Sequence, residues 1–287
     1  MTTRAYAKIN LDLRLGLRRP DGYHPIDTFF VRVNVFDTLS ANITTDGKCS
    51  LSIYGDTRLS TGEDNLIIRA ARAIQKYAPK GAGVALRLDK KIPQGAGLGG
   101  GSSDAASTLL LMRKLWGTPH SDEELADLGA ELGSDVPFFL QPHAAQATGR
   151  GEILRPIPLR DLPWALLIHP GFPSPTAQAY TDYAKQPEPG REGLPLFLTQ
   201  RDGSKLTLHP RNDLERPVEG KFVWIRSARE WLEKQPGVLA ARMSGSGSTV
   251  FALWKSEGEA KKAMPPAREY FGNDAWLQVA QLICGSE

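Results

Sequence analysis

A glycine-rich stretch at residues 93–103 restricts most strongly how this chain can fold. Five glycines stand within seven positions, after an apolar run at 84–88 that is typical of a strand and before one typical of a helix from Asp104 to Trp116. Glycine lets the backbone approach a ligand closely, and N–H groups at a helix start favour anions. The stretch predicts a phosphate-binding loop, and the alternative is a flexible helix cap. Its residues are Pro93, Gln94, Gly95, Ala96, Gly97, Leu98, Gly99, Gly100, Gly101, Ser102 and Ser103.

Three familiar classes of phosphate-binding loop do not fit this stretch. Gly95, Gly97 and Gly100 match G-x-G-x-x-G, but a dinucleotide fold needs an acidic residue about 20 positions later, after a second strand. That neighbourhood is instead a helix start, in which Ser121 and Glu124 form a capping box. No lysine follows the glycines as a Walker A loop requires, and the protein-kinase motifs are absent from the sequence. The loop belongs to another lineage, in which Ser102 and Ser103 supply hydroxyl donors or a ligand for phosphate-bound Mg²⁺.

Hydrophobic periodicity places the chain in the α+β class. Residues 5–15 alternate, with Ala5, Ala7 and Ile9 on one parity and polar side chains on the parity that we expect to face away from the core. Strands and helices follow one another without strict β-α-β alternation, which disfavours a doubly wound parallel sheet. A composition break at 150–163 predicts two domains, 1–157 and 158–287. The patterns predict strands near 5–15, 29–35, 84–88, 165–168 and 276–283, helices near 65–78, 104–116, 121–133, 175–184, 225–234 and 257–264, and a loop at 185–205.

Composition narrows the partners and the compartment. The 35 basic and 32 acidic residues nearly balance, so no nucleic-acid surface is implied. Cys49 and Cys284 lie far apart, which excludes a disulfide framework and a zinc ribbon and favours a reducing cytoplasm. No apolar run reaches the ~18 residues of a membrane span. The five histidines lack metal-ligand spacing, so we expect no metal site built from protein ligands alone; any Mg²⁺ would arrive with nucleotide phosphates.

Three polar features outside the glycine-rich stretch are candidates for a site. Lys8 shares a predicted strand face with Asn10; it is either a solvated residue or a cation beside a transferred group. Asp135 precedes the apolar run 136–140 and is either a turn cap, which spacing slightly favours, or a partly buried catalytic carboxylate. A second Gly/Ser loop at 243–248 is either a hairpin connection or a segment that closes over a charged substrate.

In their order and spacing, the segments 7–11, 93–103 and 243–248 resemble the GHMP kinase superfamily along nearly the whole chain. That resemblance implies an N-terminal domain like ribosomal protein S5 domain 2, a C-terminal ferredoxin-like domain, and ATP with Mg²⁺ as phosphate donor. The segments 21–24 and 133–139 are most similar to one branch of the superfamily. In this branch, a kinase phosphorylates the 2-hydroxyl of a cytidine-diphosphate-linked methylerythritol in non-mevalonate isoprenoid synthesis.

The same resemblance assigns roles to individual residues. It implies that Asp135 accepts or orients the acceptor's proton and that Lys8 keeps this carboxylate ionised and polarises the hydroxyl, as a nearby cation can. It implies that Tyr23 stacks on cytosine and that His24 binds the polar edge of the base. The remaining residues that it implies are Asn10, Thr176 and Tyr180 for the substrate, with Tyr180 otherwise a core residue, and Ser244, Gly245, Ser246 and Gly247 for the closing loop.

Two other functions remain open alternatives at this stage. One is another kinase of the superfamily, such as homoserine or mevalonate kinase, whose acceptor offers no base for Tyr23 to stack on. The other is a nucleotide-binding regulator without chemistry, which the presence of both Lys8 and Asp135 disfavours. The chain departs from the pattern of the branch at Asp12, Pro25 and the 185–205 loop.

Overall fold

The computed structural model describes residues 1–20, 22–55 and 58–285. Asp21, which belongs to the segment 21–24, lies outside the described residues. Within the described chain no helix has both the length and the apolar composition that a membrane crossing requires. The strands are β1 (Thr2–Leu15), β2 (Ile26–Thr44), β3 (Cys49–Tyr54), β4 (Gly83–Asp89), β5 (Ala144–Thr148), β6 (Ile153–Ile157), β7 (Leu159–Arg160), β8 (Trp164–His169), β9 (Leu196–Gln200), β10 (Lys205–Leu208), β11 (Ala240–Met243), β12 (Val250–Trp254) and β13 (Trp276–Ile283).

The helices complete a mixed architecture, and the predicted α+β class is confirmed. The helices are α1 (Leu66–Gln75), α2 (Gly100–Trp116), α3 (Asp122–Leu132), α4 (Val136–Leu140), α5 (Thr176–Lys185), α6 (Glu215–Lys221), α7 (Val223–Glu233) and α8 (Glu257–Phe271).

The chain divides into two compact units, each assembled from separate stretches. Unit 1 contains Met1–Ala7, Val35–Ile92 and Gly99–Pro142; unit 2 contains Lys8–Asn34, Pro93–Leu98 and His143–Glu287. The strands β1 and β2 contribute residues to both. The sequence-based domain boundary after residue 157 stays a prediction.

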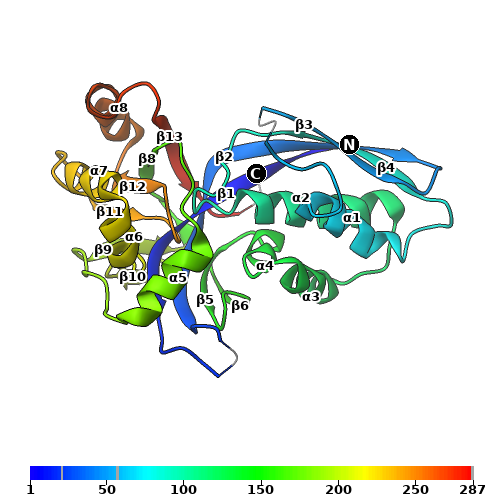
Figure 1. Ribbon diagram of the computed structural model, residues 1–287, viewed down its shortest axis with the longest axis horizontal. Helices are drawn as coiled ribbons and strands as arrows, with labels where there is room; N and C mark the ends of the chain where they lie inside the picture. The colour runs from blue at the N-terminus through cyan, green and yellow to red at the C-terminus, as the bar shows by residue number, and fades with distance from the viewer. Residues whose placement is uncertain (21, 56–57, 286–287) are drawn as a thin grey trace. The chain divides into compact units, whose positions relative to one another are not determined.

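Unit 1 packs helices against a small sheet. Strand β4 pairs antiparallel with β2, from Thr38 opposite Asp89 to Thr44 opposite Gly83, and parallel with β3. Helix α1 begins because the Asn65 side chain accepts a hydrogen bond from the Ile67 N–H, and its apolar face is fully buried. Figure 1 shows α1 beside α2, which it contacts, while α4 contacts α2 and α3.

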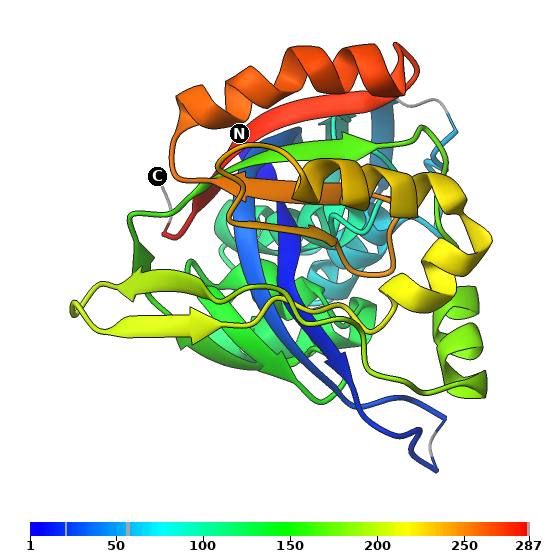
Figure 2. The same ribbon diagram turned by 90° about the vertical axis from the view of Figure 1, so that its left-hand side faces the viewer.

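Unit 2 is built on an antiparallel sheet in the order β11-β12-β8-β13, which continues to Arg32 and Val33 of β2. Every residue of β12 is buried, as expected of a central strand. Helix α7 contacts β11 and β12, and α8 lies along β13 and β8, as Figure 2 shows. A separate sheet joins β7, β9 and β10.

Most predicted elements form, and four differ from the prediction. Helix α2 begins at Gly100 instead of Asp104. Strand β9 interrupts the predicted 185–205 loop, because Leu196 and Leu198 alternate into the core. Helix α8 continues beyond residue 264, through two prolines to Phe271. The predicted break at 150–163 contains β6 and β7.

A buried ion cluster joins β2, the end of β4 and the first turns of α2 in unit 1. Lys90 Nζ donates to Asp37 Oδ2 at 2.5 Å and to Asp104 Oδ2 at 2.8 Å, and all three side chains are at most 5% exposed. Asp37 Oδ1 also accepts the Lys91 and Ile92 N–H groups. A Cβ added to Gly100 would lie 2.9 Å from Lys90 Nζ. This glycine therefore makes room for the lysine, a packing role independent of any ligand.

The cluster makes a testable contribution to the pH dependence of stability. Burial raises the pKa of Asp104 to about 7, against the opposing effect of Lys90. Because the folded pKa lies above the unfolded value of about 3.9, this group stabilises the fold below pH 4, and its contribution is lost as the pH rises towards 7. The asparagine of Asp104→Asn stays neutral, so we expect the free energy of unfolding of this variant to increase relative to that of the original chain as the pH rises over that range. Urea unfolding between pH 4.5 and 7.5 measures the difference.

Asp89→Asn is the matched control, because Asp89 is 37% exposed and lies on the adjoining strand. Its unfolding free energy should track that of the original chain across the range. If the free energies of unfolding of Asp104→Asn and of the original chain changed in parallel with pH, the raised pKa of Asp104 would be contradicted.

Candidate functional site

In unit 2, the first half of the glycine-rich stretch is bonded through its backbone to the second Gly/Ser loop. The Thr249 N–H donates to Ala96 O at 3.1 Å, and Ser244 Oγ donates to Gly97 O at 2.9 Å. Gly97 has φ +75°, and an added Cβ would overlap Ser244 O. The two loops therefore form one backbone layer that requires glycine at position 97.

Lys8 and Asn10 lie together beneath this layer. The Lys8 N–H donates to Leu98 O at 2.9 Å, and Lys8 Nζ donates to Asn10 Oδ1 at 2.7 Å. Asn10 Nδ2 in turn donates to Thr28 Oγ1 at 2.8 Å. Both residues are only 4% exposed. This burial excludes the alternative that Lys8 is a solvated residue, because the two loops cover the strand face at these two positions. Thr28, on the neighbouring strand, has no sequence signal of its own.

The predicted closing loop lies against the same pair of side chains. A Cβ placed on Gly245 would be 3.5 Å from Lys8 Nζ and 3.4 Å from Asn10 Oδ1. Ser246 Oγ shares a hydrogen bond with Thr176 Oγ1 at 2.8 Å, at the start of α5. The structure thus brings five predicted site residues together in one unit: Lys8, Asn10, Gly245, Ser246 and Thr176.

An aromatic group lies at another part of unit 2. His24 is 7% exposed, and its Nδ1 donates to Gly16 O at 2.9 Å. Its ring centroid lies 6.3 Å from that of Tyr180 and 5.5 Å from that of Tyr183. His24 Nε2 is buried and lacks a hydrogen-bond partner among the described residues. Because Nδ1 carries the proton, Nε2 of the neutral ring is an acceptor available to a ligand.

Tyr23 differs from its neighbour, because its ring is 54% exposed. The Arg150 guanidinium lies 5.2 Å from the ring centroid, within the range of a cation–π contact. Sequence analysis missed both Arg150 and Tyr183. The spacing of Tyr183, three residues after Tyr180 on one helix face, could have indicated it; Arg150 has no comparable signal.

Pro93, Gln94, Gly95 and Gly247 also belong to unit 2, whereas Gly99, Gly100, Gly101, Ser102, Ser103 and Asp135 belong to unit 1. Gly99 has φ +67° and precedes α2, whose Ser103 N–H donates to Gly99 O at 2.9 Å. Ser102 and Ser103 therefore stand in the first turn of the helix. Asp135 directly precedes α4, but its side chain makes no capping hydrogen bond there. Both interpretations of Asp135, as a turn cap and as a catalytic carboxylate, stay predictions.

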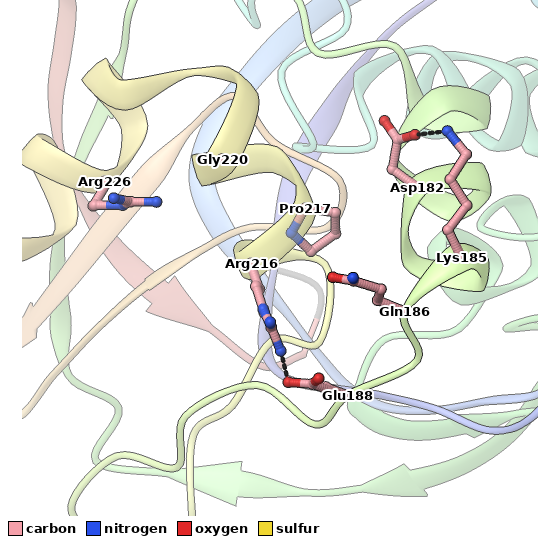
Figure 3. Close-up of a pocket in the computed structure, with 8 residues that line it drawn as sticks. All are labelled: Asp182, Lys185, Gln186, Glu188, Arg216, Pro217, Gly220 and Arg226. Carbon is pink, nitrogen blue, oxygen red and sulfur yellow. Dashed lines mark hydrogen bonds and ion pairs between the residues drawn. The ribbon is translucent and has the colours of Figure 1, made fainter.

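A cavity of about 520 Å³ lies between α5 and α6 in unit 2 (Figure 3). Its lining carries opposite charges that already pair, such as Lys185 with Asp182 and Arg216 with Glu188. None of the predicted site residues lines it. Among the described residues, no group of three or more His, Cys, Asp or Glu side chains is arranged to hold a metal ion.

The backbone layer at Gly97 makes a prediction about stability. Gly97→Ala adds both the cost of a left-handed alanine, about 1–2 kcal/mol, and an overlap with Ser244 that costs a further ~1–3 kcal/mol. Gly117→Ala is the matched control, because Gly117 has φ +63° with nothing within 4 Å of an added Cβ. We expect Gly97→Ala to lose clearly more unfolding free energy in urea. Equal losses would show that the loops separate freely.

Comparisons with known proteins identify the family of this chain. The chain matches the family models described as "GHMP kinases N terminal domain" at residues 65–142 and "GHMP kinases C terminal" at residues 203–273. It is 36% identical to a 4-diphosphocytidyl-2-C-methyl-D-erythritol kinase of Methylacidiphilum infernorum, over 97% of this chain and 96% of the relative. Its identity to the enzyme of that name from Chromobacterium violaceum is 39%, over 90% and 87% of the two chains.

A solved structure gives the same assignment. The crystal structure of a 4-(cytidine 5'-diphospho)-2C-methyl-D-erythritol kinase superposes with a TM-score of 0.76 at 32% identity, covering all of both chains. Sequence identity and fold therefore agree over the full length of the chain. The chain belongs to the GHMP kinases and, within them, to the family of the 4-diphosphocytidyl-2-C-methyl-D-erythritol kinases.

Proposed function

We propose that this chain transfers the γ-phosphoryl group of ATP to the 2-hydroxyl of 4-diphosphocytidyl-2-C-methyl-D-erythritol, with Lys8 and Asp135 acting on the acceptor. The observation that carries the chemical part of the proposal is the buried Lys8 ammonium, held by Asn10 between the two Gly/Ser loops. A lysine ammonium in a nearly dry position exerts a strong field on a developing negative charge.

The reaction moves one phosphoryl group and one proton. The acceptor oxygen forms a bond to the γ-phosphorus as the bond from that phosphorus to the leaving ADP oxygen breaks. Asp135 accepts or orients the hydroxyl proton, and Lys8 stabilises the charge on the acceptor oxygen. Lys8 lies in unit 2 and Asp135 in unit 1, so their pairing is part of the proposal.

The glycine-rich stretch would hold the donor nucleotide. The N–H groups at the start of α2 lack intrahelical partners, as at any helix N-terminus, and they suit the phosphates. Ser102 lies in the first turn of α2, where its hydroxyl would join a Mg²⁺ ion bound to those phosphates. The ion would neutralise phosphate charge. A cytoplasmic location, with only small-molecule partners, remains a prediction.

The aromatic group supports recognition of a cytidine. The buried Nε2 of His24 is an acceptor that matches the exocyclic amino group of cytosine. Stacking of the base on an aromatic ring such as Tyr23 is worth ~1–3 kcal/mol, and Tyr180 would close the other side. Mevalonate and homoserine carry no base, so these contacts favour the cytidyl acceptor over the acceptors of the other kinases.

A panel of acceptors tests the substrate. ADP release is measured with ATP and Mg²⁺ in parallel reactions on 4-diphosphocytidyl-2-C-methyl-D-erythritol, mevalonate and homoserine. We expect turnover on the cytidyl compound alone, because only this acceptor presents a base to His24. Turnover on another acceptor alone would retain the phosphate loop and reject the base contacts.

The catalytic pair is tested by Asp135→Asn. This change keeps the size of the side chain and removes its charge, so we expect the turnover number to fall by at least about a hundredfold. ATP binding, followed by calorimetry, should stay within about threefold of the original value. Asp122→Asn, at a 91% exposed side chain of α3, is the control and should keep full turnover. Survival of turnover in Asp135→Asn would reject the proposed mechanism.

A further inference from the structure

Residues 211–215 (Arg-Asn-Asp-Leu-Glu), which connect β10 to α6, are bonded to the closing loop. Asn212 is 1% exposed, and its Nδ2 donates to Met243 O and Gly245 O, both at 2.8 Å. Its Oδ1 accepts the Leu214 N–H at 2.9 Å, which fixes the orientation of the amide. Glu215 Oε1 accepts the Met243 N–H at 2.8 Å. Two side chains from one short segment thus satisfy three backbone groups of the loop.

The same segment also binds the strand that carries Lys8. The Leu13 N–H donates to Arg211 O at 2.7 Å, and the Asp213 N–H donates to Leu13 O at 3.0 Å. The Leu15 N–H donates to an Asp213 carboxylate oxygen at 2.8 Å. Figure 2 shows this stretch passing beside the blue strand β1 on its way to α6. The segment is therefore held to β1 by its backbone and the Asp213 side chain, and to the loop by the side chains of Asn212 and Glu215.

Asparagine is the side chain that this position needs. Two buried carbonyl oxygens require two donors, and an amide supplies both without bringing a charge into the core. Alanine would leave both carbonyls unpaired, and a carboxylate would face them with like partial charge. Gly245 carries one of the two carbonyl groups that Asn212 binds, and it is the loop residue next to Lys8 Nζ and Asn10 Oδ1.

We propose that Asn212 is a positioning residue for phosphoryl transfer, which sets the closing loop at a fixed height over Lys8 and Asn10. The inference rests on the proposed function of that site. Because Asn212 acts through the loop, its loss displaces groups around the transferred phosphoryl and leaves the aromatic residues around His24 in place. The expected signature is a change in kcat that is much larger than the change in KM.

The test uses Asn212→Ala and Asn212→Asp in the full chain. We expect kcat to fall by about tenfold to a hundredfold, the range for small misplacements of reacting groups, while KM for the cytidyl acceptor changes less than threefold. Val218→Ala is the matched control: it makes a cavity at a 3% exposed position of α6 without removing a loop hydrogen bond. The comparison is made with thermal unfolding measured on all chains.

If Val218→Ala loses as much kcat as the Asn212 variants at the same loss of thermal stability, the positioning role of Asn212 is overturned and its role is only structural. KM rising as much as kcat falls would overturn it as well. Amide hydrogen exchange supplies a readout without turnover, so it separates this proposal from the proposed function. We expect the amides of Met243, Ser244 and Gly247 to exchange faster in Asn212→Ala, with those of β4 unchanged.

If neither Asn212 variant folds, amide hydrogen exchange in the original chain still tests the proposal. Bound as described, the Met243, Ser244 and Gly247 amides should exchange at least tenfold more slowly than the exposed turn at 201–204. Exchange as fast as that turn would show that the segment does not hold the loop. An original chain that lacks turnover on the cytidyl compound, yet shows this protection, would reject the proposed function alone.

Discussion

The close approach of two backbone loops is the constraint on which the site in unit 2 depends. Ala96 and Gly97 accept hydrogen bonds from Thr249 and Ser244, and this spacing exists because position 97 has no Cβ. Once the loops are joined, they cover Lys8 and Asn10 and exclude water from an ammonium that would otherwise be solvated. The position of the cation is thus a consequence of packing between main chains more than of its own side-chain contacts.

Buried charge is handled in two different ways in this chain. In unit 1, the Lys90 ammonium donates to the carboxylates of Asp37 and Asp104, and burial still raises the pKa of Asp104 to about 7. In unit 2, the Lys8 ammonium donates to the amide oxygen of Asn10 and lies 5.0 Å from the centroid of the Phe30 ring. Two carboxylates of the same unit bind the first ammonium, and the two Gly/Ser loops cover the second.

Sequence patterns predicted the parts of this molecule that depend on local order. The helix at 122–132 with its capping box, the strand at 276–283 and the two Gly/Ser loops follow from short-range periodicity and turn chemistry. The burial of Lys8 was not predictable, because the residues that cover it lie about 90 and 235 positions away along the chain. The packing role of Gly100 was not predictable either, because it depends on the tertiary position of the Lys90 side chain; its place in a phosphate-binding loop stays a prediction.

The hydrogen bonds between residues 211–215 and β1 also determine when, during synthesis, β1 can gain all of its partners. The amides of Leu13 and Leu15 find their partners nearly 200 residues later, and the cover over Lys8 comes from residues 244–249. At a synthesis rate of about 5–20 residues per second, the partners of β1 are made about ten seconds or more after the strand itself. β1 therefore gains these partners only when translation is nearly finished, and a nascent chain that ends before residue 211 leaves the amides of Leu13 and Leu15 without them.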